Sequence, residues 1–220
     1  MFQKDYIKRS FSFIQATLAR LRGVAEEGDA DVAREEITDA YSQVFGIPLS
    51  LLILSPVSDI VDLLSTSEGE DSERILSLAE LLKMDGELYQ KEGDVEEAQW
   101  RFALALELLV ASVESSDQPI ARATAESFEP IVRFSLQSLK SLGLLAALYG
   151  LYRQSGNDGL AVDLILAFIE TEGGQDEGIQ EGIAFISELQ GKSDEALEQG
   201  NITRQEIDDA LNTLNEIGAS

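Results

Sequence analysis

The stretch 85–108, DGELYQKEGDVEEAQWRFALALEL, decides the fold. It contains small residues, aromatics and two glycines at intervals that suit two helices joined by a tight turn. Gly93 followed by Asp94 marks the turn, because glycine adopts left-handed backbone angles freely and aspartate is common in tight turns. We therefore expect one helix over 72–92 and a second over 94–114.

The small residues on either side of this turn predict close packing of the two helices. Gly86 and Ala98 would let antiparallel helices approach where larger side chains would hold them apart. Tyr89 and Phe102 would fill the space beside that contact, and Ala105 would admit a neighbouring helix. This spacing indicates helix packing and not catalytic chemistry.

These positions resemble the tetratricopeptide repeat, a pair of helices of about 34 residues that recurs in tandem. The best match covers 79–112, and weaker echoes cover 14–47 and 142–175. The resemblance implies one all-α domain over 1–220, an irregular TPR-like superhelix of about eight to ten antiparallel helices. A globular helical bundle without superhelical regularity is the structural alternative. The six matching residues are Gly86, Tyr89, Gly93, Ala98, Phe102 and Ala105.

The rest of the chain also has the pattern of helices, and no segment alternates convincingly with period two. One helix is expected to reach Lys140 with a kink or break at Pro130. Thr203 and Glu206 fit a capping box at the start of the last helix. Further helices are expected at 47–54, 144–156, 157–174, 177–190 and 204–217.

The composition limits the classes of partner. The formal net charge is −25, with 41 acidic and 16 basic side chains, which disfavours binding to nucleic acid. The most apolar run, IPLSLLIL at 47–54, is far shorter than the ~20 residues of a membrane span. No secretory signal is visible, so we expect a protein of the cytoplasm.

Residues 1–22 carry five basic side chains and one acidic, a net charge of +4. Ile7, Phe11, Ile14 and Leu18 form an apolar stripe at helical spacing, which Leu21 extends. We interpret this segment as the first helix of the body, packed on acidic neighbours. The alternative is peripheral membrane association through this basic amphipathic helix.

Catalytic and metal-binding patterns are weak. The chain has no histidine and no cysteine, which removes the commonest general base, Ser–His–Asp and Cys–His sites, and thiolate metal ligands. Acidic clusters do not match a calcium loop. We expect no enzyme activity, no cofactor and no metal. The alternative from another class is a carboxylate-based hydrolase or a ligand-binding helical protein.

In tetratricopeptide proteins the first helix of each pair lines a groove, and this resemblance suggests where a partner protein or peptide would bind. In the second echo the corresponding positions are Gly143, Ala146, Gly150, Arg153 and Gln154, whose small members leave room for a partner. Because the chain is acidic, we expect a partner of basic or mixed charge. The candidate partner-binding residues are Lys83, Glu87, Gln90, Lys91 and Arg153.

A second resemblance covers roughly 1–112. MFQKDYIKR, GIPLSLL and ILSLAELLKMDGELYQKEGDVEEA are similar to an uncharacterised family of bacterial proteins. This resemblance implies a helical bacterial protein and supplies no activity. The last helix, with Ile207, Leu211 and Leu214 among its apolar residues, would suit either capping of the array or a homodimer.

Overall fold

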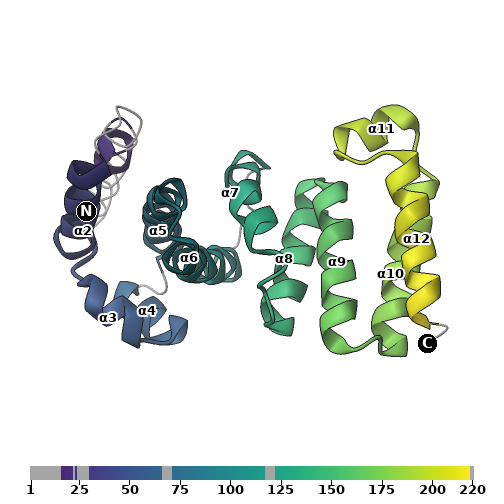
Figure 1. Ribbon diagram of the computed structural model, residues 1–220, viewed down its shortest axis with the longest axis horizontal. Helices are drawn as coiled ribbons and strands as arrows, with labels where there is room; N and C mark the ends of the chain where they lie inside the picture. The colour runs from purple at the N-terminus through teal and green to yellow at the C-terminus, as the bar shows by residue number, and fades with distance from the viewer. Residues whose placement is uncertain (1–15, 22, 24–29, 66–70, 117–121, 219–220) are drawn as a thin grey trace, which may run out of the picture. The chain divides into compact units, whose positions relative to one another are not determined.

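The computed structural model describes residues 16–21, 23, 30–65, 71–116 and 122–218. All regular structure within these residues is helical, so the all-α class is confirmed (Figure 1). The chain divides into two compact units, Met1–Gln118 and Pro119–Ser220. A single domain over 1–220 stays a prediction, because one domain can contain more than one compact unit.

The first unit is organised around a long antiparallel helix pair, α5 and α6. Helix α2 packs on α5, and α4 packs on both members of the pair. Residues 16–21 are helical, and Leu18 and Leu21 are buried. The other members of the N-terminal apolar stripe lie outside the described residues. The helices of this unit are α2 (Ala30–Phe45), α3 (Leu49–Leu54), α4 (Val57–Leu64), α5 (Ser72–Glu92) and α6 (Val95–Glu114).

The α5–α6 pair has the bounds and the packing that the sequence predicts. Gly93 ends α5 with a left-handed φ of 83°, and the Asp94 carboxylate accepts a hydrogen bond from the backbone N–H of Glu97 at 3.3 Å. A Cβ on Gly86 would lie 2.5 Å from Cε1 of Phe102, so only glycine allows this ring to pack here. Ala98 is fully buried, and so is Ala105 on the same helix. The helix-packing interpretation of these small residues is confirmed.

The second unit is a row of packed helices. Helix α8 pairs with α9, α9 packs on α10, and α12 contacts both α9 and α10, while α7 packs on α8 (Figure 1). Helix α7 continues through Pro130 and ends at Ser135, so the expected extension to Lys140 is wrong. The helices are α7 (Arg122–Ser135), α8 (Leu142–Ser155), α9 (Asp158–Glu172), α10 (Asp176–Gln190), α11 (Asp194–Gln199) and α12 (Arg204–Gly218).

The turn between α8 and α9 repeats the turn between α5 and α6. Gly156 ends α8 with a φ of 78°, and the Asn157 side chain accepts from the backbone N–H of Leu160 at 3.2 Å. The N–H of Asn157 donates to the carbonyl of Tyr152 at 3.0 Å, as the N–H of Asp94 does to that of Tyr89. The two helix pairs therefore have the same kind of turn, with a left-handed glycine, a side-chain cap and the same backbone hydrogen bond. The glycine of the faintest echo, Gly28, lies outside the described residues.

Candidate functional site

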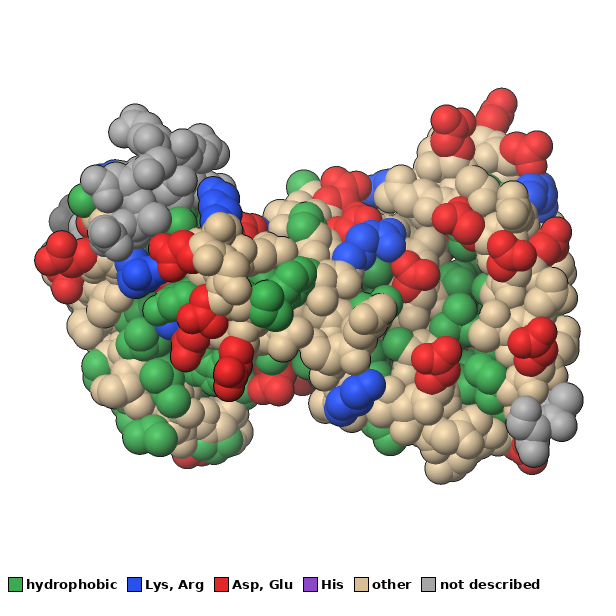
Figure 2. All heavy atoms as spheres, in the orientation of Figure 1, with side chains coloured by type: hydrophobic (Ala, Val, Ile, Leu, Met, Phe, Trp, Pro, Cys, Tyr) green, Lys and Arg blue, Asp and Glu red, His purple; other side chains and the backbone are tan. Residues whose placement is uncertain are grey.

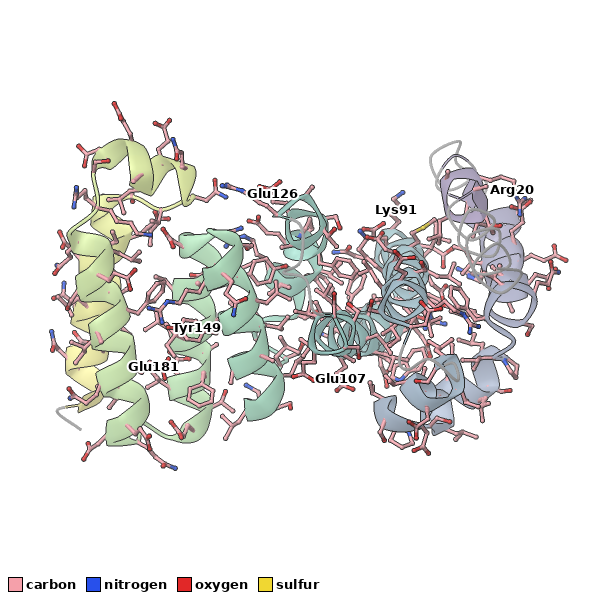
Figure 3. All side chains as sticks on the ribbon, turned by 180° about the vertical axis from the view of Figure 1, so that it is seen from behind. Arg20, Lys91, Glu107, Glu126, Tyr149 and Glu181 are labelled. Atoms are coloured by element: carbon pink, nitrogen blue, oxygen red, sulfur yellow. The ribbon has the colours of Figure 1, made fainter. Side chains whose placement is uncertain are left out.

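A groove of about 630 Å³ lies on helices α8, α9 and α10 of the second unit. Ile165 and Phe168 contribute apolar surface from α9, and Glu181 faces the groove from α10. Figure 3 shows Tyr149 and Glu181 near each other on α8 and α10. The residues that α8 contributes are Ala146, Tyr149, Gly150, Arg153 and Gln154.

The groove exists because α8 carries small residues on the face that it presents here. A Cβ built on Gly150 would meet no other atom within 4 Å, so the space beside this residue is open. Ala146, one helical turn earlier, is the next small residue on the same face. Four of the second-echo positions, Ala146, Gly150, Arg153 and Gln154, line the groove.

Arg153 links α8 to α10 at the edge of the groove. Its Nη1 donates to the hydroxyl of Tyr149 at 3.0 Å, and its Nη2 lies 2.9 Å from Oε2 of Glu188. The guanidinium also lies 4.8 Å from the ring centroid of Phe185, which packs edge-on against Tyr149 with a centroid distance of 5.6 Å. A cation, two aromatic rings and a carboxylate thus hold one wall in place.

Tyr149 is almost completely buried within this wall, with 7% of its surface exposed. Burial raises the pKa of its hydroxyl, and the guanidinium of Arg153 offsets part of that rise. The phenol therefore keeps its proton at neutral pH and acts as a hydrogen-bonding group. The groove therefore combines an apolar floor, an exposed carboxylate at Glu181 and the fixed guanidinium of Arg153.

The structure divides the sequence-predicted binding residues between the two units. Lys83 is buried on α5, with Nζ 3.2 Å from a carboxylate oxygen of Glu80, so we leave it out of the binding surface. The remaining candidates are Glu87, which is half-buried on α5, Gln90 and Lys91, which are exposed at the end of α5, and Arg153, which is exposed on α8.

A second groove of about 240 Å³ tests the carboxylate-based alternative. Three of the residues that line it, Asp163, Glu206 and Asp209, are acidic. Asp163 lies 2.8 Å from Nη1 of Arg133, and the Glu206 carboxylate accepts from the backbone N–H of Thr203 at 2.8 Å. Two of the three carboxylates are therefore used in an ion pair and a helix cap. Within the described residues, no cluster of acidic side chains is arranged to hold a metal ion.

Sequence reasoning missed a buried ionic cluster in the first unit. Nε of Arg101 donates to Oδ2 of Asp85 at 2.5 Å, the hydroxyl of Tyr41 donates to the same oxygen at 3.0 Å, and Glu97 pairs with Nη1 of Arg101. The guanidinium stacks 3.9 Å from the ring centroid of Tyr89. The sequence did contain one indication of this cluster. Asp85 directly precedes Gly86 and Arg101 directly precedes Phe102, so both charged residues lie next to positions that pack between the helices. This cluster joins α2, α5 and α6, which indicates a structural role.

The lengths and compositions of the helices bear on whether the chain could cross a membrane. Among the described residues, no helix combines the length and the apolar character that crossing a bilayer requires. The association of residues 1–22 with a membrane surface is a separate matter, and most of that segment lies outside the described residues.

The whole chain was compared with known families, curated proteins and solved structures. No curated protein and no solved structure matches the chain. The model of a family of unknown function, DUF6483, matches residues 1–218. The match extends over both helical units, beyond the half of the chain that the sequence resemblance covers. The chain therefore belongs to the DUF6483 family, a family of unknown function.

Proposed function

We propose that this protein is a non-catalytic protein-binding module, and that the groove on α8, α9 and α10 receives a peptide segment of its partner. The observation that carries the proposal is the open space beside Gly150 in a groove with an apolar floor. A peptide side chain can enter that space without displacing any described side chain. The repeated turns at Gly93 and Gly156 favour a TPR-like arrangement of the helix pairs, in which such grooves bind peptides.

The charges of the groove define the chemistry of the partner. Glu181 is exposed, and Arg153 is already paired with Glu188, so the carboxylate of Glu181 is the charge offered to a ligand. An apolar side chain of the peptide would contact Ile165 and Phe168, and a Lys or Arg would face Glu181. Because the whole chain is strongly acidic, such a partner would also associate faster at low ionic strength.

Selection of short random peptides on the full-length protein would test this proposal. We expect the selected peptides to combine an apolar residue with Lys or Arg. Gly150→Phe, which fills the open space, and Glu181→Lys, which reverses the charge, should each weaken binding of a selected peptide about tenfold or more.

Gly143→Phe is the matched control, because Gly143 lies on the same helix, also faces open space, and does not line the groove. It should bind the selected peptides as the unchanged protein does. Peptides that bind Gly150→Phe as tightly as the unchanged protein would place the binding surface elsewhere and contradict the proposal.

A further inference from the structure

Helices α3 and α4 of the first unit expose far more apolar surface than a short helix pair normally does. Leu54 is 82% exposed, Ile53 and Leu63 are each 54% exposed, and Leu51 is 40% exposed. In α3, which is almost entirely apolar, only Leu52 is buried. We call the four exposed residues, Leu51, Ile53, Leu54 and Leu63, the α3–α4 face.

Single exposed leucines are ordinary on protein surfaces, but a group of four is not. These four come from two helices that only Ser55 and Pro56 separate. Figure 2 shows hydrophobic side chains gathered over the region of α3 and α4. Grouped apolar residues of this kind mark surfaces that contact another molecule.

The charges around this face select the kind of molecule. Asp59 and Asp62 on α4 are both exposed, and residues 46–65 contain no Lys or Arg. The charged residues of α3 and α4 themselves thus give the apolar face an acidic border, and Arg74 of α5 donates from Nη1 to the carbonyl of Leu64 at 3.2 Å at the end of α4. An anionic membrane surface is a poor match, because binding there relies on Lys and Arg beside the apolar residues.

A second copy of the chain is also a poor match. In a two-fold dimer the same face meets itself, which would bring Asp59 and Asp62 close to their counterparts. Like charges placed together across an interface oppose association, and each copy carries a net charge of −25. The acidic border instead complements Lys or Arg on a different protein.

We propose that the α3–α4 face binds an amphipathic helix of a partner protein, whose apolar side chains are flanked by Lys or Arg. An amphipathic helix presents its apolar residues at intervals of three and four, and so could cover the four exposed side chains together. This surface lies in the first unit and is independent of the groove on α8, α9 and α10.

The probe is a synthetic helical peptide with leucines on one face and lysines on both sides of them, labelled for fluorescence anisotropy with the full-length protein. The double variant Leu54→Ser, Leu63→Ser should weaken binding about tenfold at physiological salt. Its control is the double variant Val95→Ser, Leu142→Ser, which removes two exposed apolar side chains elsewhere. The control should bind within about twofold of the unchanged protein.

The charge contribution needs its own pair of variants, because a cationic peptide is attracted to any acidic protein. Asp59→Asn with Asp62→Asn should weaken binding severalfold more than Asp208→Asn with Asp209→Asn, which makes the same charge change on α12. If the two asparagine variants lose binding equally, net charge alone explains the binding and the proposal is overturned. The proposal is also overturned if the two double serine variants bind the peptide equally well.

Two other occupants are tested with the same proteins. Sedimentation with anionic vesicles that is lost on Leu54→Ser, Leu63→Ser would assign the face to a membrane. A dimer mass in light scattering that becomes monomeric in this variant would assign it to a second copy. Either result overturns the proposal, and circular dichroism checks that each variant is folded.

Discussion

Nε of Arg101 on α6 lies 2.5 Å from Oδ2 of Asp85 on α5, and both side chains are almost fully buried. Burial raises the pKa of Asp85, while the charge and hydrogen bonds of Arg101 act in the opposite direction. A buried ion pair is costly to break, because the remaining charge is left without a partner.

In the α8–α9 pair, apolar residues occupy the two positions that correspond to Asp85 and Arg101. Asp85 and Arg101 lie eight residues before and after the turn glycine Gly93. At the same separations from Gly156, the other pair holds Leu148 and Leu164, both fully buried.

Arg101→Leu alone should therefore lower the free energy of unfolding by about 3–5 kcal/mol, and Asp85→Leu with Arg101→Leu should recover most of that loss. Urea unfolding followed by the fluorescence of Trp100, the only tryptophan of the chain, reports on α6 directly. A double variant as unstable as the single one would show that the ionic cluster itself, with its hydrogen bond to Tyr41, stabilises the first unit.

Gly86 is the second position where the α5–α6 pair tolerates little change. In Gly86→Ala the new methyl would lie 2.5 Å from Cε1 and 2.7 Å from Cδ1 of Phe102, so the ring has to move. We expect a loss of about 1–3 kcal/mol in the same unfolding measurement. Phe102→Leu should lose less stability in the Gly86→Ala background than in the unchanged protein. Equal losses in both backgrounds would mean that the methyl and the ring do not compete for space.

Much of this helix pair could be predicted because its signals are local. Gly93 and Asp94 fix the turn by backbone freedom and capping, and the predicted bounds agree with α5 and α6 within one residue. The capping box at Thr203 and Glu206 also forms as predicted, with the N–H of Glu206 3.3 Å from the hydroxyl of Thr203. Such features depend on residues a few positions apart.

The features that sequence reasoning missed depend on contacts between distant residues or on very short elements. Asp85 and Arg101 are charged, so the hydrophobic pattern gives no reason to bury them, and only the packing of α2, α5 and α6 does so. In the groove, Gly150 could be predicted, but Glu181 and Phe185 could not, because the alignment of α10 against α8 is not encoded locally. The short helix α11 has a serine cap at Ser193 that was overlooked.

Mild acid should stabilise the fold. Partial burial raises the pKa of Glu107 and Asp163 above the ordinary carboxyl values. At neutral pH these groups are ionised in both states, and the folded state bears the cost of their burial. As the pH falls through each raised pKa, the folded state takes up the proton first, so stability rises until the unfolded chain protonates near pH ~4.

The pKa of Glu206 is shifted in the opposite direction, so this residue limits how far stability can rise as the pH falls. Hydrogen bonds from Thr203 lower its pKa, so its contribution is present above the ordinary glutamate pKa and is lost as the pH falls through its folded value. Thermal unfolding between pH 7.5 and pH ~3 should therefore show a rise in Tm toward pH ~4 and a fall below it. Glu107→Gln should flatten the rise, because desolvation alone raises the pKa of Glu107, and an unchanged slope would contradict its role.

The start of α9 packs closely against the loop that follows α11. The N–H of Gly159 donates to the carbonyl of Gly200 at 2.9 Å, and a Cβ on Gly159 would overlap the backbone carbonyl of Asn201. Asn201 itself has a positive φ of 56°, so this loop has little freedom to move away. Gly159→Ala should cost about 3 kcal/mol or more, because backbone yields less readily than the ring of Phe102.

Amide hydrogen exchange would show which part of the second unit is destabilised by Gly159→Ala. In Gly159→Ala the amides of α11 should exchange faster, since the loop after this helix loses its contact with α9. Gly150→Ala is the control, because its methyl meets no atom within 4 Å and replaces glycine inside a helix. It should raise stability by up to about 1 kcal/mol and leave exchange in α11 unchanged. Unaltered protection of α11 in Gly159→Ala would mean that this helix is held by its other contacts, such as the hydrogen bond from Nη2 of Arg122 to the carbonyl of Gln199.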